Sequence, residues 1–424
     1  MKKVHFVGIG GIGTSALARC FLQMGLVVSG SDCADSDLLQ ELENEGIKIF
    51  PQHNAANVPV DCDLVIFSAA VETSNPELRL AHERNLNVKN YFQALGEMSR
   101  KFLTVAVAGT HGKSTTTAMT ALALEKASAD PTVFVGAKVP QWGGKNFRAG
   151  GSKILVVEAC EHFSHFLHFA PQVLVLTNVD FDHRDFFKTQ ENYFQAFSEL
   201  IAKSQIVVAD FSNENVQRVT RDFSGEKVDT SPLLKKVPSL QVPGEHNREN
   251  ASRVLGVFQA LNLPVEKAAA SLQEFAGTKR RFEFLGERSG VKVFDDYAHH
   301  PAEIQATLKA ARGQFPQEKI WAIFQPHMFS RTGDFLAEFS SSFRLANEVL
   351  IPNIFPARER AKDFPGISAQ VLAGKIAKSG TVSRSTGGFA GTLQILRDET
   401  ASGDILLFLG AGDIWRVARD FLES

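Results

Sequence analysis

The sequence predicts an α/β fold in three domains, and three observations support this prediction. Short apolar strands alternate with helical segments throughout the 424 residues, as in doubly wound parallel sheets. Two of the strands run into glycine-rich turns that open helices, at residues 8–13 and 109–112. A further series of strands begins near residue 291. We expect a Rossmann-like domain at residues 1–98, a central domain of the P-loop type at 99–287 and a Rossmann-like domain at 288–424.

The composition is that of a globular chain and excludes several classes of partner. A formal net charge of −2 gives no reason to expect nucleic acid or an anionic membrane surface. No apolar run approaches the roughly 18–20 residues of a membrane span, and the N-terminus leads directly into a strand, so we expect no export. The cysteines lack C-x-x-C spacing, which fits a reducing cytoplasm.

The first glycine-rich turn, Gly8–Gly13, follows the apolar strand Val4–Val7 and opens a helix at about Thr14. It matches the G-x-G-x-x-G pattern, and Asp32 supplies an acidic residue about 20 positions further on. Such a turn lets a diphosphate approach the backbone and a helix N-terminus closely. The pattern alone leaves two ligands open, an NAD-type dinucleotide and a UDP-sugar.

The second turn is a variant phosphate loop. The strand Thr104–Ala108 precedes it and helical spacing begins at Ser114, although Val107 stands where the strict P-loop motif has its first glycine. Lys113 would reach the β and γ phosphates of ATP, and the Ser114 hydroxyl would ligate Mg²⁺. The alternative is an ordinary corner with an exposed lysine. The residues predicted to bind the nucleotide here are Gly109, Thr110, His111, Gly112, Lys113, Ser114 and Thr115.

Polar residues follow two further strands of the central region. The strand Ile154–Val157 ends at Glu158, and the strand Val173–Thr177 leads to a loop that contains His183. The carboxyl ends of parallel strands share the sheet edge at which a phosphate loop opens, so Glu158 and His183 are candidate metal ligands beside Ser114. Alternatively, Glu158 caps a neighbouring helix and His183 is an ordinary loop histidine.

The later part of the chain carries three more candidate groups. Asn247 and Asn250 share one face of a predicted helix and offer amides to an adenine edge, although surface amides would give the same pattern. Residues 277–282 form a basic cluster, which a solvated charge run would also explain. The strand that begins at Val291 ends in two acids and two histidines, at residues 295–300, which is typical of a site.

A diphosphate site, an ATP site with Mg²⁺ and a third domain with charged loops together indicate ATP-driven joining of two molecules. In order and spacing, eight motifs resemble those of the Mur ligases of peptidoglycan synthesis, along essentially the whole chain. The motifs are Gly8–Gly13, Ser29–Asp32, Gly109–Thr115, His246–Asn247, Gly277–Phe282, Asp295–Pro301, Phe324–His327 and Gly410–Asp413.

The resemblance implies a ligase of the alanine-adding branch, with UDP-N-acetylmuramate, L-alanine and ATP as its small-molecule substrates. ATP would phosphorylate the lactyl carboxylate of the muramic acid, and the amine of alanine would displace phosphate from the acyl phosphate. Catalysis would then rest mainly on positioning and charge neutralisation. The three domains would bind the UDP-sugar, ATP and the amino acid, in that order. A cytoplasmic monomer or weak homodimer is expected.

The resemblance also implies roles at the reacting phosphate. Lys113 would hold the β and γ phosphates, and Arg281 would reach towards the γ-phosphate. Ser114 and Glu158 would bind one Mg²⁺, and His183 would bind a second.

Further roles are implied for the nucleotide and the two substrates. Asn247 and Asn250 would face adenine, and Asp296 would help to hold ATP from the third domain. The residues implied around the incoming alanine are Tyr297, His299, His327 and Arg331. The residues implied around the UDP moiety are Gly10, Gly11 and Ile12, at the diphosphate, and Asp32, at the nucleoside.

The chain departs from the family pattern at three places. Ser114 replaces the commoner threonine but keeps the hydroxyl. Phe197 occupies the position of a lysine that is carbamylated in ligases of later steps, which fits the alanine-adding branch. Residues 158–162 read Glu-Ala-Cys-Glu-His, so only Glu158 takes a role and Glu161 and His162 remain unassigned.

Three other functions remain to be distinguished. A recycling ligase that adds a tripeptide to UDP-N-acetylmuramate would share the first two domains, but Tyr297 and the motif Phe324–His327 favour alanine. An NAD-dependent dehydrogenase would leave the second phosphate loop and the third domain without a purpose. A non-catalytic ATP-binding switch would bind nucleotide and form no amide.

Overall fold

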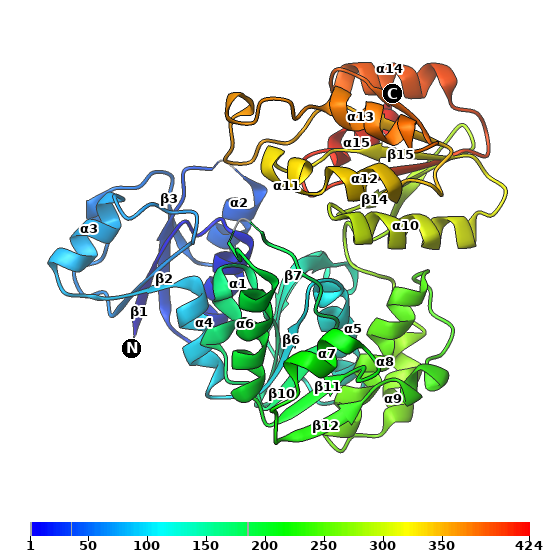
Figure 1. The fold of residues 1–424 in the computed structure, drawn as a ribbon. Coiled ribbons are helices and arrows are strands. Elements are labelled where there is room, and N and C mark those ends of the chain that lie inside the picture. The colour runs from blue at the N-terminus through cyan, green and yellow to red at the C-terminus, as the bar shows by residue number, and fades with distance from the viewer. Residues whose placement is uncertain (1, 35, 185) are drawn as a thin grey trace. The chain divides into compact units, whose positions relative to one another are not determined.

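The computed structural model describes residues 2–34, 36–184 and 186–424, which form three sheets in succession along the chain (Figure 1). The chain divides into two compact units. The first unit comprises Met1–Asp182, Gln190–Val237 and Ala251–Leu272, and the second comprises His183–Thr189, Pro238–Asn250 and Gln273–Ser424. The first unit therefore contains two of the sheets and the second unit contains the third. No helix in the described ranges is long and apolar enough to span a membrane.

The first sheet is parallel throughout, with the strand order β3-β2-β1-β4-β5. This is the Rossmann-like arrangement predicted from the sequence. Its central strand β1 is buried from Val4 onward because helices cover both faces of a parallel sheet. The strands are β1 Lys3–Val7, β2 Val27–Ser31, β3 Lys48–Phe50, β4 Leu64–Phe67 and β5 Asn87–Asn90; the α-helices are α1 Ile12–Gln23, α2 Asp37–Asn44, α3 Pro76–Glu83 and α4 Tyr91–Ser99.

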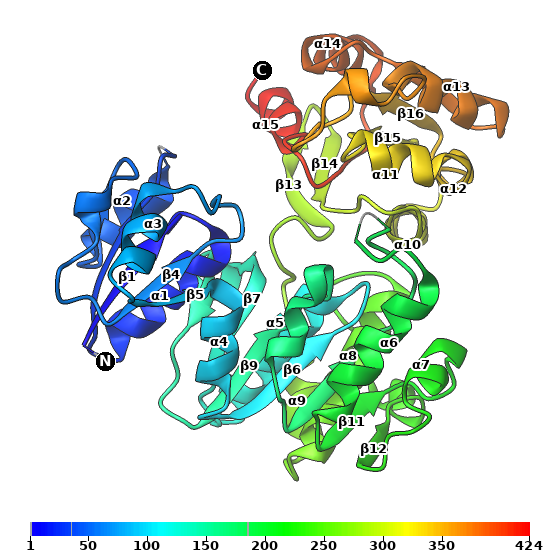
Figure 2. The same ribbon diagram turned by 60° about the vertical axis from the view of Figure 1, so that its left-hand side comes forward.

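The second sheet has the order β12-β11-β10-β6-β9-β7-β8, and only the pairing of β7 with β8 is antiparallel (Figure 2). Strand β6 lies in the middle, between β10 and β9, so the phosphate loop that follows β6 opens at the centre of the sheet edge. The strands are β6 Leu103–Ala108, β7 Thr132–Val139, β8 Lys145–Arg148, β9 Ile154–Glu158, β10 Val173–Leu176, β11 Ile206–Ala209 and β12 Glu226–Asp229.

The helix after the phosphate loop, α5 (Lys113–Lys126), is buried on nearly all sides, although Ser114 and three consecutive threonines, residues 115–117, stand in its first turns. It contacts β7, β9 and helix α9, so its small side chains allow close packing in every direction. The remaining helices of this region are α6 Gln190–Ala202, α7 Glu214–Val219, α8 Glu245–Ala260 and α9 Val265–Leu272, and the 3₁₀ helices include η2 Pro140–Trp142 and η3 His162–His168.

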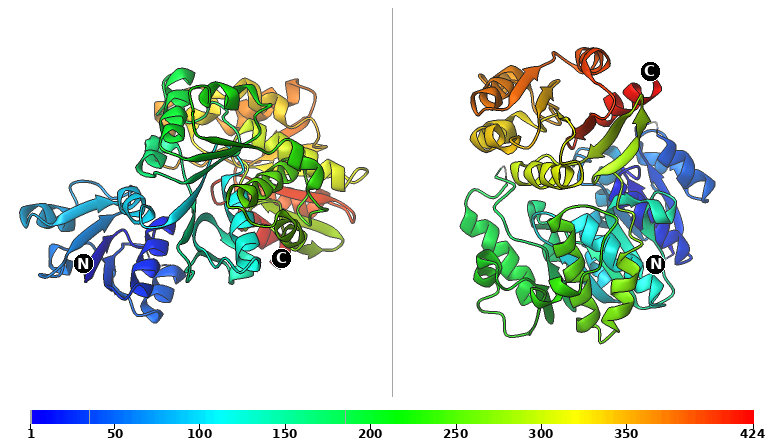
Figure 3. Two further views of the ribbon diagram at one scale, coloured as in Figure 1. Left: turned by 90° about the horizontal axis from the view of Figure 1, so that it is seen from below. Right: turned by 90° about the vertical axis from the view of Figure 1, so that its right-hand side faces the viewer.

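The third sheet has the order β13-β14-β18-β15-β16-β17, with β13 antiparallel to β14. Strand β13 begins at Glu283, so this sheet starts before the domain boundary that we expect at residue 288. Helix α15 lies against β13 and β14, near the C-terminus marked in Figure 3. The strands are β13 Glu283–Arg288, β14 Val291–Asp296, β15 Ile320–Phe324, β16 Glu348–Ile351, β17 Val382–Ser385 and β18 Ile405–Leu409; the α-helices are α10 Pro301–Gln314, α11 Phe329–Asp334, α12 Leu336–Ser342, α13 Ala369–Lys378, α14 Phe389–Glu399 and α15 Trp415–Glu423.

Candidate active site

The phosphate loop between β6 and α5 depends on two glycines in conformations that L-residues rarely adopt. Gly109 has a φ of +136°, and Gly112, the residue before α5, has a φ of +80°. A Cβ atom on Gly109 would lie 2.0 Å from the Thr177 Oγ1. The loop can therefore lie flat against the end of β10 and direct the N-terminus of a 14-residue helix outward. A helix N-terminus with unsatisfied N–H groups is suited to a polyphosphate.

Side chains at the end of β10 hold the loop in place. The His111 N–H donates to the Asn178 Oδ1 at 2.9 Å, and the Thr177 hydroxyl donates to the His111 carbonyl at 2.5 Å. The Thr110 hydroxyl donates to the Asp180 carbonyl at 2.7 Å and lies 2.9 Å from the Tyr193 hydroxyl. These bonds fix the backbone before any ligand binds, which lowers the entropic cost of binding.

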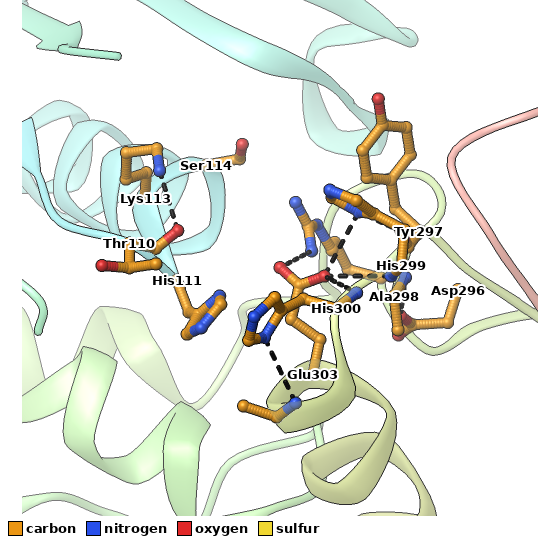
Figure 4. A network of polar contacts seen from close by, with 12 residues as sticks. Thr110, His111, Lys113, Ser114, Asp296, Tyr297, Ala298, His299, His300 and Glu303 are labelled. Atoms are coloured by element: carbon orange, nitrogen blue, oxygen red, sulfur yellow. Dashed lines mark hydrogen bonds and ion pairs between the residues drawn. The ribbon is translucent and has the colours of Figure 1, made fainter. Parts of the chain in front are cut away.

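Lys113 turns back over the loop. Its ammonium donates to the carbonyls of Gly109 and Thr110 at 2.6 and 2.9 Å, and Figure 4 shows the second of these bonds. It also forms an ion pair with the fully buried Glu161 at 3.0 Å. Burial alone would lower the pKa of Lys113, but the carboxylates of Glu161 and Glu158 raise it above its ordinary value. The lysine is therefore a permanent cation at the mouth of the loop.

Ser114 and Glu158 meet beside Lys113, as predicted. The Ser114 hydroxyl donates to the Glu158 Oε1 at 3.0 Å, and the Gly136 N–H donates to the Glu158 Oε2 at 2.6 Å. A Cβ on Gly136 would lie 2.8 Å from both carboxylate oxygens, so only glycine allows this approach. The hydroxyl and carboxylate form the hard oxygen pair that Mg²⁺ prefers. In the described ranges no cluster of three His, Cys, Asp or Glu side chains could hold a metal, so phosphate and water would have to complete such a site.

The first glycine-rich turn also lies at a helix N-terminus in the first unit. Gly11 precedes α1, whose first residue is Ile12, and the Gly10 N–H donates to the Asp32 Oδ2 at 2.8 Å. The other carboxylate oxygen of Asp32 accepts from the Ala34 N–H at 3.0 Å. A Cβ on Gly10 would lie 2.9 Å from the Asp32 Oδ2. Asp32 therefore shapes the turn, in addition to the role at the nucleoside that the sequence predicts for it.

In the second unit, Asp296 at the end of β14 is tied to the basic cluster. Its carboxylate accepts hydrogen bonds from the backbone N–H groups of Phe282 and Ala298, both at 2.7 Å. Burial raises the pKa of Asp296, and the nearby Arg281 guanidinium opposes that rise. We expect Arg281 in the central domain from the sequence, but it belongs to the second unit together with Asp296.

Glu303 on α10 contacts two of the predicted side chains in this unit. The His299 Nδ1 lies 3.2 Å from its Oε2, and an Arg281 nitrogen lies 3.9 Å from its Oε1. The Arg281 guanidinium also lies over the Tyr297 ring, 5.3 Å from the centroid. Figure 4 shows Glu303 with Tyr297 and His299. Glu303 thus links His299 to Arg281, a role that its position in a predicted helix does not reveal.

His327 completes the predicted amino-acid site. Its ring stacks on Phe355 at 5.4 Å between centroids and meets the His299 ring edge-on at 6.2 Å. Its Nδ1 has no hydrogen-bond partner within the described ranges. Arg331, on α11, is only 9% exposed. A buried guanidinium near a neutral imidazole is suited to bind a carboxylate and leave the ring available to an amine.

We predict that His327 stays uncharged well below neutral pH. Burial and the positive Arg331 lower the pKa of His327 from 6.5 to about 4. The neutral ring therefore contributes stability that is present above pH 6.5 and is lost as the pH falls towards 4. An NMR titration, with the ring assigned by comparison with His327→Gln, should give a midpoint near pH 4. A midpoint near 6.5 would contradict this prediction.

The other predicted ligands remain predictions. Asn247 and Asn250 are both buried near the start of α8, but the Asn247 amide donates to the Pro243 carbonyl at 2.7 Å, and the Asn250 amide donates to the Asn247 Oδ1 at 3.4 Å. These contacts use part of the amide groups predicted for adenine. His183 has a φ of +53° and belongs to the second unit, whereas Ser114 and Glu158 belong to the first.

Glu161 and Gly136 were missed by the sequence reasoning. Glu161 lies only three residues after Glu158, yet its role is set by Lys113, 48 positions earlier in the chain. The acidic pair around Cys160 was the available signal, because two carboxylates next to a buried strand rarely serve packing. Gly136 had no signal, since a glycine inside a strand usually indicates only a bulge or a close approach.

Comparison with known proteins identifies the family of the chain. Residues 3–103 match the family model "Mur ligase family, catalytic domain", residues 107–233 match "Mur ligase middle domain", and residues 280–412 match "Mur ligase, glutamate ligase domain".

Full-length relatives show the same likeness. The chain is 38% identical to the UDP-N-acetylmuramate–L-alanine ligase of Acetivibrio thermocellus, with 100% of this chain and 96% of that protein covered. It is 39% identical to the enzyme of that name from Caldanaerobacter subterraneus subsp. tengcongensis, with 100% and 98% covered. The crystal structure of the UDP-N-acetylmuramate–alanine ligase of Thermotoga maritima is 29% identical, has a TM-score of 0.80 and covers 100% of this chain and 99% of that one. The chain belongs to the Mur ligase family.

Proposed function

We propose that the chain joins L-alanine to the lactyl carboxylate of UDP-N-acetylmuramate at the expense of ATP, in the synthesis of peptidoglycan precursors. The carrying observation is that the first unit holds two anion cradles, each a glycine turn at a helix N-terminus, at α1 and α5. One cradle fits a substrate diphosphate and the other fits ATP. The relatives named for this reaction cover the chain from end to end, which favours alanine addition over tripeptide recycling.

The reaction requires activation of a carboxylate, which is a poor acyl donor. A lactyl carboxylate oxygen attacks the γ-phosphorus of ATP, so that an acyl phosphate forms and ADP leaves. Lys113 neutralises the charge that develops on the phosphate oxygens, and Arg281 is proposed to act with it from the second unit. Mg²⁺, if held by Ser114 and Glu158 as their oxygen donors suggest, would supply further charge neutralisation. His183 is proposed as a ligand of a second ion.

The amide then forms at the acyl carbon. The amine nitrogen of alanine attacks the carbonyl carbon, the tetrahedral intermediate expels phosphate, and the nitrogen loses its proton. Arg331 is proposed to bind the alanine carboxylate, with Tyr297, His299 and His327 around the amine. Because phosphate is the leaving group, the residues of the chain need only position the amine and exclude water. We propose that the enzyme acts in the cytoplasm, where these nucleotide substrates are expected.

The substrate assignment predicts a specific order of activity. Release of phosphate should be measured with ATP, Mg²⁺ and UDP-N-acetylmuramate in the presence of L-alanine, glycine, D-glutamate or the tripeptide L-alanyl-γ-D-glutamyl-meso-diaminopimelate. We expect the highest kcat/KM with L-alanine and only background release without UDP-N-acetylmuramate. A preference for the tripeptide would refute the alanine assignment, and release that is independent of any acceptor would indicate an ATPase.

A further inference from the structure

Tyr91 lies against the first glycine-rich turn of the first unit. It is the first residue of α4, whose start is fixed by a capping box: the Asn90 side chain accepts from the Gln93 N–H, and the Gln93 side chain accepts from the Asn90 N–H, both at 2.9 Å. Helix α4 contacts both α1 and η3. The first turn of α4 is therefore held rigidly where the first sheet's domain meets the second.

The Tyr91 ring packs directly on the first turn of α1. A Cβ on Gly13 would lie 2.7 Å from the Tyr91 Cζ, so the ring occupies the space that any other residue at position 13 would need. The next residue, Phe92, stacks on His165 of η3 with 3.8 Å between ring centroids. The start of α4 is thus held against α1 through Tyr91 and against η3 through Phe92.

The Tyr91 phenol lies near Glu158, one of the two predicted metal ligands of the first unit. Glu158 and Cys160 are the charged and polar neighbours that add to burial in raising the pKa of Tyr91. The phenol is therefore a neutral donor at any physiological pH. Within the described ranges it makes no hydrogen bond. The phenol can therefore donate a hydrogen bond to an oxygen atom of a ligand. Such a ligand would lie near Glu158, which accepts a hydrogen bond from the Ser114 hydroxyl.

We propose that Tyr91 is a substrate-positioning residue, whose phenol donates a hydrogen bond to the carboxylate that is to be phosphorylated. This inference rests on the proposed function, because it concerns a substrate that is held by its diphosphate at α1 and reacts beside Ser114 and Glu158. The Tyr91 ring lies against the first turn of α1, where that diphosphate is proposed to bind. A neutral donor there would let a substrate carboxylate approach although Glu158 carries the same charge.

The test compares two ligands that differ in the acid group. UDP-N-acetylmuramate carries the lactyl carboxylate and UDP-N-acetylglucosamine lacks it. In Tyr91→Phe the ring stays on Gly13 and only the hydroxyl is lost. By isothermal titration calorimetry, we expect the affinity for UDP-N-acetylmuramate to fall about tenfold and that for UDP-N-acetylglucosamine to change less than about twofold. A purely structural role would change both affinities equally.

Two further variants complete the design. Tyr193→Phe is the control, because it removes a phenol that contacts Thr110 of the phosphate loop and not the first turn of α1. It should leave the ratio of the two affinities as in the unaltered chain. Gly13→Ala should displace the Tyr91 ring and lower the same ratio, so the test survives if Tyr91→Phe does not fold. If the unaltered chain forms the amide and a folded Tyr91→Phe variant keeps the same ratio of the two affinities, this inference is overturned and the proposed function stands. Absence of amide formation in the unaltered chain would instead overturn the proposed function.

Discussion

Replacing Lys113 by alanine should lower kcat for amide formation at least about 100-fold. The ammonium caps the phosphate loop through two carbonyls and is balanced by the buried Glu161. It is therefore positioned before ATP binds, and it needs little rearrangement to neutralise charge that appears only in the transition state. Because nearby carboxylates keep its pKa above the ordinary range, the effect should be the same at every assay pH at which the protein is folded.

The measurement is steady-state release of ADP with saturating substrates, together with a binding titration with ATP. Lys101→Ala, an exposed lysine just before β6, serves as the matched control and should retain full activity. The free energy of unfolding should be compared as well, since Lys113→Ala leaves Glu161 buried without its cation. A folded Lys113→Ala variant with unaltered turnover would remove Lys113 from the catalytic residues.

Replacing Gly109 by alanine should disrupt the phosphate loop itself. The new methyl group would lie 2.0 Å from the Thr177 Oγ1 and 2.8 Å from the Asn178 carbonyl oxygen, at a φ of +136°. The loop would have to leave the end of β10 and lose the hydrogen bonds that hold His111. We expect a loss of about 2–3 kcal/mol in the free energy of unfolding and at least about a tenfold weaker affinity for ATP.

Urea denaturation and calorimetric titration with a non-hydrolysable ATP analogue would measure the two effects. Gly374→Ala is the matched control: this glycine lies inside α13 with no atom within 4 Å of an added Cβ. It should raise the free energy of unfolding by about 0.5–1 kcal/mol, because alanine favours a helix. If Gly109→Ala unfolded at the same urea concentration as the unaltered chain, the strain assigned to this loop would be wrong.

The strand–turn–helix units were predictable because their signals are local. The strand before each glycine turn and the helix after it are confirmed within a few residues, as β1 with α1 and β6 with α5. Glycine at a positive φ and a helix N-terminus are properties of about ten consecutive residues, so they can be recognised without knowledge of the fold. The pairing of Ser114 with Glu158 was also predictable, because parallel strands end at one edge of the sheet.

The boundary between the later domains was harder to predict. The basic cluster at residues 277–282 and most of β13 fall within the range 99–287 that we expect for the central domain, but β13 pairs with β14 in the third sheet. Because of that pairing, the Phe282 backbone N–H donates a hydrogen bond to the Asp296 carboxylate, and Arg281 lies near the same carboxylate. An antiparallel edge strand added to a parallel sheet has no local signal that indicates which sheet it joins.

The sequence by itself determined the three-domain α/β architecture, the two strand–turn–helix units with their glycine turns and the family. The tertiary structure alone decided that Glu161 pairs with Lys113, that Gly136 makes room for Glu158 and that Tyr91 lies on Gly13. The physical reason is the range of the forces involved. Backbone conformation is fixed by neighbours in the chain, whereas a buried ion pair or a close contact depends on strand register, such as that of Val107 opposite Glu158, which many distant residues set together.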